Sequence, residues 1–143
     1  MKKHFWVWIV ILIFMSSFAV AQQYDAGVQG RVIIATDKTS GGHPIKYPKS
    51  DKGKVTAMEV VIAPGAETGW HKHPVPVYAY VLAGELSVLM EDGQQLQFKQ
   101  GDAIIEVVDV QHNGINKGKA PVRLIVFYTG VVDVPNVIRS DKP

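Results

Sequence analysis

Two histidines separated by a single residue, His71 and His73, are the side chains in this sequence best suited to chemistry. Side chains of an extended strand alternate between its two faces, so both imidazoles project from one face and Lys72 from the other. Two such imidazoles can bind the same metal ion, but a metal site needs at least three protein ligands. The remaining ligands must therefore come from elsewhere in the chain.

Of the two other histidines that follow residue 21, His112 is the better candidate for a third ligand. It follows a strand-like segment that begins after Gly101, so a neighbouring strand could bring it opposite the first pair. His43 precedes Pro44 in a loop-like segment, where a histidine is usually solvated. Three imidazoles on one ion leave coordination positions open, which is typical of catalytic rather than structural metal sites.

The chain contains no cysteine. This excludes disulfides, a thiolate nucleophile and a cysteine-ligated zinc, so any metal ligands must be histidine, carboxylate or water. We find no Ser-His-Asp set and no residue spaced as a dedicated general base. Chemistry at the histidines would therefore depend on a bound metal.

The first 21 residues have the features of a secretory signal peptide. Lys2 and Lys3 precede an apolar run over 5–15, and an A-x-A pattern ends at Ala21, after which cleavage is predicted. An uncleaved membrane anchor is the alternative, although the 17 residues 5–21 are at the short limit for a span. We expect a periplasmic or secreted protein that is free of the membrane after cleavage.

Removal of the signal peptide leaves a chain with balanced charge. It takes away Lys2 and Lys3, so the 15 Lys and Arg fall to 13, against 13 Asp and Glu. No basic stripe interleaved with aromatic residues is present, and nucleic-acid binding is therefore disfavoured.

The rest of the sequence predicts an all-β fold. Residues 22–53 form a lead-in with a β-branched run at 31–35 that could open a sheet, 54–130 form the core, and 131–143 form a C-terminal arm. The predicted strands are 55–63, 75–82, 85–91, 96–98, 103–110 and 122–129. Many short strands at close spacing, without helical periodicity, indicate a β-sandwich or barrel.

Two of these strands, 55–63 and 122–129, carry apolar residues at both alternating positions for much of their length. A sheet with one wet face would not show this pattern. It predicts that one side packs on the barrel interior and the other on a flanking strand or a second subunit, so we expect a homodimer.

The residue spacing resembles the two sequence motifs of the cupin superfamily, which comprises small β-barrels with a metal in the interior. The first motif, G-x5-H-x-H-x3-E-x6-G, is matched by Gly65, His71, His73 and Gly84. The second, G-x5-P-x-G-x2-H-x3-N, is matched by Gly101, His112 and Asn116. The resemblance implies a single-domain cupin-type β-barrel (a double-stranded β-helix or jelly roll) with the three histidines as metal ligands. From its surroundings alone, Asn116 is predicted to be a turn residue that bonds its own backbone.

The sequence departs from the motifs at three positions: Val77 replaces the glutamate, and Val107 and Asp109 replace the proline and glycine of the second motif. In cupins with the full set, the glutamate joins the three histidines on the metal, so the resemblance implies a three-His variant. Glu67, Glu106 or Asp109 could supply a carboxylate instead. Whether Glu67 or Glu106 binds the metal, or contacts a residue that does, is left open.

Three neutral imidazoles leave a divalent ion its full charge and, in octahedral geometry, open positions for oxygen ligands. Resemblance to three-His cupin dioxygenases implies an oxygenase that acts on a small oxygen-bearing substrate. Fe(II) is the favoured metal, and Mn, Ni, Cu and Zn are alternatives. The second hypothesis is a non-catalytic cupin that binds or senses a small ligand. Because a fold does not specify a reaction, neither metal nor substrate follows from the sequence.

Overall fold

The computed structural model describes residues 27–141, so the predicted signal peptide at 1–21 lies outside the described residues. The chain divides into two units, Met1–Val32 and Ile33–Pro143, and every strand of the described residues belongs to the second. Among the described residues, no helix has the length and apolar character needed to cross a membrane.

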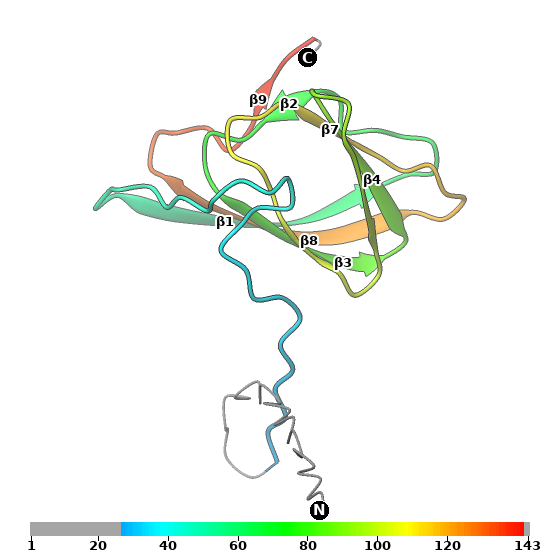
Figure 1. The fold of residues 1–143 in the computed structure, drawn as a ribbon, viewed down its shortest axis with the longest axis horizontal. Coiled ribbons are helices and arrows are strands. Elements are labelled where there is room, and N and C mark those ends of the chain that lie inside the picture. Colours follow the sequence, from blue (N-terminus) through cyan, green and yellow to red (C-terminus); the bar gives the residue numbers. More distant parts are fainter. Residues whose placement is uncertain (1–26, 142–143) are drawn as a thin grey trace, which may run out of the picture. The chain divides into compact units, whose positions relative to one another are not determined.

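Two antiparallel sheets face each other in the second unit (Figure 1). One has the strand order β1-β8-β3-β6 and the other β5-β4-β7-β2-β9. The strands are β1 (Gly53–Ile62), β2 (His71–Lys72), β3 (Val77–Ala83), β4 (Glu85–Met90), β5 (Gln95–Lys99), β6 (Ala103–Ile105), β7 (His112–Ile115), β8 (Val122–Val131) and β9 (Ile138–Arg139). The prediction of an all-β jelly-roll barrel is confirmed.

The core lies between the two sheets and follows the period-two pattern of the sequence. In β8, Val122, Leu124 and Val126 are buried while the residues between them are wholly or partly exposed. β3 does the same with Val77 and Val81. Each fully buried aliphatic side chain of this size stabilises the fold by about 1.5–3 kcal/mol. β1 pairs with β8 along its whole length and forms the edge of its sheet.

Two strand predictions are corrected by the structure. The strand predicted over 103–110 ends at Ile105; the chain then leaves the sheet and bends at 108–109, with a left-handed φ of 59° at Asp109. The β-branched run 31–35 forms no strand; its residues find no partner strand in the described part of the chain, and Val32 and Ile33 remain exposed. β-propensity expresses packing against neighbours, so an unpaired run has little reason to form a strand.

The matched motif positions have structural roles at the strand connections. Gly65, Gly84 and Gly101 all have positive φ. At Gly84, between β3 and β4, a Cβ atom would lie only 2.7 Å from the carbonyl oxygen of Pro121, so this close approach excludes larger residues. Asp109 stands at the motif glycine of the second motif and keeps the left-handed conformation, which Asp tolerates better than most residues.

Asn116 is a turn residue, as predicted, because its Oδ1 accepts a hydrogen bond from the Gly118 amide at 2.9 Å. It also has a second role that the sequence did not indicate. Its Nδ2 donates to the carbonyl oxygens of Ile62 and Ala120, each at 2.9 Å, and the side chain is fully buried. Asn116 therefore ties the end of β1 to the loop before β8.

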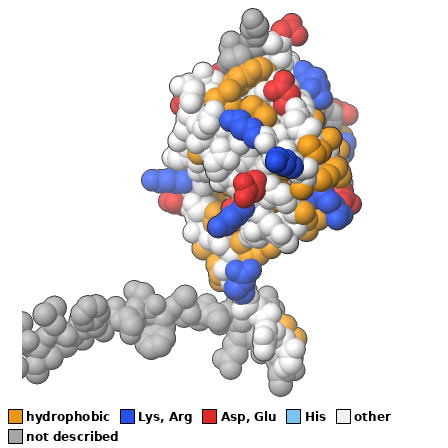
Figure 2. Space-filling view, turned by 90° about the vertical axis from the view of Figure 1, so that its right-hand side faces the viewer, with side chains coloured by type: hydrophobic (Ala, Val, Ile, Leu, Met, Phe, Trp, Pro, Cys, Tyr) orange, Lys and Arg blue, Asp and Glu red, His pale blue; other side chains and the backbone are white. Residues whose placement is uncertain are grey.

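The loop-like segment around His43 is a loop in the structure and contacts the end of β6. The Ser40 amide donates to the Ile105 carbonyl oxygen at 2.7 Å, and the Ile105 amide donates to Ser40 Oγ at 3.2 Å. Figure 2 shows one face of the described residues, on which Lys and Arg side chains are interspersed with Asp and Glu and with hydrophobic side chains.

Candidate metal centre

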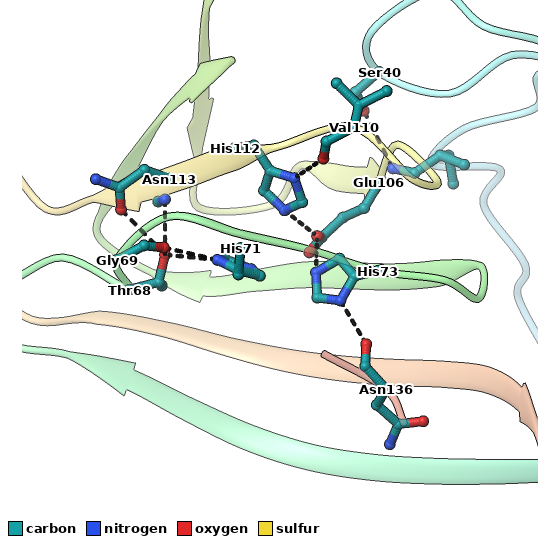
Figure 3. Close-up of polar contacts among 12 residues, drawn as sticks. Ser40, Thr68, Gly69, His71, His73, Glu106, Val110, His112, Asn113 and Asn136 are labelled. Carbon is teal, nitrogen blue, oxygen red and sulfur yellow. Dashed lines mark hydrogen bonds and ion pairs between the residues drawn. The ribbon is translucent and has the colours of Figure 1, made fainter. Parts of the chain in front are cut away.

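The three predicted ligands, His71, His73 and His112, meet inside the barrel (Figure 3). β2 and β7 pair directly through His71 and His112, and His73 lies just beyond β2. The closest ligand atoms of the three residues lie within 4.8 Å of one another. Because side chains alternate along an extended chain, His71 and His73 lie on the same face, and that face is toward His112 on the neighbouring strand.

Each histidine is oriented by a hydrogen bond from Nδ1 to a backbone carbonyl oxygen. The acceptors are Gly69 for His71 at 2.8 Å, Asn136 for His73 at 2.8 Å and Val110 for His112 at 2.9 Å. A carbonyl oxygen can only accept, so the proton of each neutral ring lies on Nδ1. Each Nε2 therefore presents a lone pair, which is the tautomer that a metal ligand requires.

The residues present fit a divalent metal ion. Three imidazole nitrogens converge on one point, and no hydrogen bond of good geometry satisfies the buried His112 Nε2, although Glu106 Oε2 lies 3.2 Å from it. A buried polar atom without a partner is costly, and coordination to a cation would satisfy it. Imidazole is a good ligand for iron, nickel, copper and zinc. A divalent metal is therefore the cofactor that this cluster suits.

Glu106 lies at the same point. Its Oε2 is 3.0 Å from His73 Nε2 and 3.2 Å from His112 Nε2 (Figure 3). The residue follows directly after β6, and its amide donates to the Val77 carbonyl oxygen at 2.9 Å, so it is the cross-strand neighbour of the missing motif glutamate. Of the acidic residues considered from the sequence, Glu106 is the one that the structure brings to the histidines.

The ionisable groups of the cluster influence one another. Burial alone would raise the pKa of the Glu106 carboxyl, but the His112 and His73 rings in contact with it hold that pKa well below its usual range. Burial would lower the pKa of His112, and the Glu106 carboxylate beside it raises it instead. His71 has no such carboxylate beside it, and burial lowers its pKa to about 4. At neutral pH the site thus holds an ionised carboxylate beside imidazoles.

The other predicted carboxylate, Glu67, is not brought to the cluster. It is exposed, and its Oε2 accepts a hydrogen bond from Asn113 Nδ2 at 2.9 Å. Asn113 Oδ1 in turn accepts from the hydroxyl of Thr68 at 3.3 Å, and Thr68 Oγ1 lies 3.5 Å from His71 Nδ1. Glu67 therefore reaches a histidine only through two other side chains.

A cavity of about 80 Å³ opens beside the histidines, enough for several water molecules or a small ligand. Its wall is mostly apolar and comes from both sheets. The lining residues include Ile62, Leu86, Val88, Met90, Phe98, Ile104, Leu124 and Val126. A molecule that occupies the cavity would contact the histidines and Glu106 at its polar end and hydrocarbon elsewhere.

Sequence reasoning missed Thr68, Asn136 and Tyr128. Neither Thr68 nor Asn136 belongs to a motif. The Thr68 hydroxyl lies beside His71, and the main-chain carbonyl of Asn136 accepts a hydrogen bond from His73. Tyr128 lines the cavity, and its ring centroid is 5.6 Å from that of His73. Burial, and then the charge of Glu106, raise the pKa of the Tyr128 hydroxyl, so it stays protonated and can donate a hydrogen bond. The one sequence signal for Tyr128 was its position in β8, two residues after the buried Val126 and on the same face of the strand.

The predicted C-terminal arm packs onto the histidine strand. β9 pairs with β2 through His71 with Arg139 and Lys72 with Ile138. The Arg139 guanidinium also donates to the Thr68 carbonyl oxygen at 3.0 Å. Together with the Asn136 carbonyl, these contacts fix the backbone on which the first two ligands stand.

The fold and the site define an antiparallel jelly-roll barrel with an internal three-histidine cluster. The family model described as "Cupin domain" matches residues 58–128. The chain belongs to the cupin superfamily, as the motifs predicted.

Solved structures with this fold include an oxalate oxidase, at 22% identity and a TM-score of 0.51 over 59% of this chain and 45% of that one. A DMSP lyase, DddQ from Ruegeria pomeroyi DSS-3, matches at 23% identity and a TM-score of 0.53 over 69% of this chain and 47% of that one. A cupin-like protein from Thermotoga maritima matches at 20% identity and a TM-score of 0.53 over 62% of this chain and 65% of that one. The chain thus spans less than half of the oxidase and lyase chains. No curated protein sequence matches it.

Proposed function

We propose that this protein is an exported, metal-dependent cupin oxygenase that acts on a small oxygen-bearing substrate. His71, His73 and His112 would hold the metal, with Fe(II) favoured. Bound there, such an ion supplies Lewis acidity and access to O₂ chemistry. Export is supported by the signal-peptide features of residues 1–21.

The observation that carries the proposal is the convergence of three Nε2 lone pairs beside an apolar cavity. Three protein nitrogens leave positions on a metal for a substrate oxygen and a second small molecule. The apolar wall limits water around them, and Tyr128 offers one hydrogen-bond donor at the cavity surface. Substrates with one or two oxygen donors and a compact hydrocarbon body match these features.

The solved relatives are named for two different reactions, an oxidation and a lyase reaction, so the shared fold does not select between them. The test uses the chain from Gln22 onward, its metal measured by elemental analysis, and O₂ consumption followed with diketones, catechols and hydroxy acids. We expect about one metal per chain, O₂ uptake with at least one substrate class, loss of uptake after chelation and recovery with Fe(II). Metal binding without O₂ uptake across the panel would favour the non-catalytic ligand-binding module. Absence of bound metal would contradict both.

We also propose a homodimer, supported by apolar side chains on the outer face of β1 and β8. Val55 and Val61 of β1 are 66% and 60% exposed, and Phe127, on the same face of β8, is 44% exposed. Exposed apolar residues gathered on one sheet face indicate a protein contact. A Val61→Lys variant is expected to raise the dimer dissociation constant by about tenfold or more in light scattering, since one well-placed interface residue is commonly worth over 1 kcal/mol. Glu91→Lys, at an exposed turn, is the control, and a wild-type monomer at micromolar concentration would refute the proposal.

A further inference from the structure

We infer that Glu106 is a fourth ligand of the metal centre, supplying from the end of β6 the carboxylate that the first cupin motif places at position 77. The inference rests on the metal binding proposed above. It changes the site from three neutral donors to three neutral donors and one anion, which lowers the net charge at a divalent metal and leaves one position fewer for substrate.

The backbone places Glu106 next to the position of the missing motif glutamate. β3 and β6 pair from Tyr78 with Ile105 onward, and the pairing continues through the hydrogen bond from the Glu106 amide to the Val77 carbonyl oxygen at 2.9 Å. Val77 itself is 1% exposed and packs in the hydrophobic core. Glu106, at the end of β6, can thus supply the carboxylate that Val77 of β3 lacks.

The distances fit ligands of one ion. Two donors that bind a metal at about 2.1 Å and at right angles to each other lie about 3.0 Å apart. Glu106 Oε2 is 3.0 Å from His73 Nε2 and 3.2 Å from His112 Nε2. One carboxylate oxygen therefore occupies the separation expected of a neighbouring ligand to two of the three histidines at once.

When the rings are neutral, their Nδ1 hydrogen bonds make these contacts unfavourable, and a shared metal ion or a proton on the ring would relieve them. Nδ1 of His73 and of His112 each donate to a backbone carbonyl, so Nε2 of each neutral ring is an acceptor. A carboxylate oxygen at 3.0 Å from His73 Nε2 would then place lone pair against lone pair. A metal ion bound by both Nε2 and Oε2 would remove this repulsion. A proton on Nε2 would also remove it, but the imidazole ring would then be positively charged.

The remaining acids near the site do not compete for this role. The Asp109 side chain is 62% exposed and lies 3.5 Å from Lys72 Nζ, on the opposite side of the strand from the histidines. Glu67 is exposed and contacts Asn113. Among the described acidic residues, Glu106 alone has an ion-pair contact with two of the predicted ligands.

The test measures Co(II) binding and the visible spectrum of the bound Co(II), which reports ligand number and type without any substrate. Glu106→Gln keeps the side-chain shape and removes the anion. Because loss of a residue behind a ligand already costs about 10- to 100-fold in metal affinity, we expect loss of a ligand to cost more than about 100-fold. We also expect a changed spectrum. Glu91→Gln, at an exposed turn outside the histidine cluster, is the matched control and should bind like the wild type.

The double variant Val77→Glu/Glu106→Gln returns the carboxylate to its motif position and is expected to recover most of the affinity. If Glu106→Gln unfolds, Glu106→Asp, which withdraws the carboxylate by one methylene group, should still weaken binding. Unchanged Co(II) affinity and spectrum in Glu106→Gln would overturn the inference and leave the three-His proposal standing. A wild-type protein that binds no divalent metal would overturn both.

Discussion

Replacement of His73 by alanine is expected to lower metal affinity by about 100- to 1000-fold and to abolish any metal-dependent turnover. Binding free energies of four-ligand metal sites are about 10–16 kcal/mol, so one ligand accounts for roughly 3–4 kcal/mol. His73 is 2% exposed and its ring contacts those of His71 and Tyr128, so the alanine variant removes a buried ligand from the centre of the cluster. Titration with Co(II) or Fe(II), followed by calorimetry, measures the loss.

His43→Ala is the control for this experiment. Like His73→Ala, it removes one imidazole, but from an exposed loop position that is not part of the His71, His73 and His112 cluster. We expect its metal affinity and stoichiometry to equal those of the wild type. Retention of a full complement of metal in a variant that lacks both His71 and His112 would show that the ion binds elsewhere.

Replacement of Asn116 by alanine is expected to destabilise the metal-free fold by about 2 kcal/mol. The change leaves the buried Ile62 carbonyl oxygen without its partner, whereas Ala120 and Gly118, which also lose a hydrogen bond, are exposed and can bond to water. Each buried polar group left unsatisfied costs about 1–3 kcal/mol. Urea unfolding in the presence of a chelator measures the change without a contribution from bound metal.

An Asn116→Asp variant separates hydrogen bonding from packing. It preserves the side-chain volume but replaces the two-proton donor with oxygen that faces two carbonyl groups. We expect it to be at least as unstable as the alanine variant at neutral pH. Near-wild-type stability of Asn116→Asp would mean that Asn116 matters for the space it fills and not for its bonds.

The local pattern predicted most of the fold because its strands alternate buried and exposed residues and their connections carry glycine. β3 and β8 follow such patterns directly. β7 does not, because Asn113 and Gly114 are residues typical of turns, yet pairing with β4 holds them in a strand. A Cβ atom at Gly114 would lie 3.3 Å from a Thr68 side-chain carbon, so a larger residue there would fit only if Thr68 shifted slightly.

The sequence predicted the three histidine ligands of the candidate site but not the contacts around them. The ligands were predictable because the spacing of His71, His73 and His112 depends only on strand alternation and motif positions. The role of Glu106 depends on which strand lies beside Val77, and that register is a property of the folded sheet. The carbonyl of Asn136 carries no side-chain signal at all.

The bond from His73 Nδ1 to the Asn136 carbonyl spans 63 positions of the chain. The other two histidines take their carbonyl acceptors from two residues away. The orientation of the His73 ring therefore depends on the C-terminal arm, which also pairs with β2 through β9, whereas the His71 and His112 rings are oriented by their own local backbone.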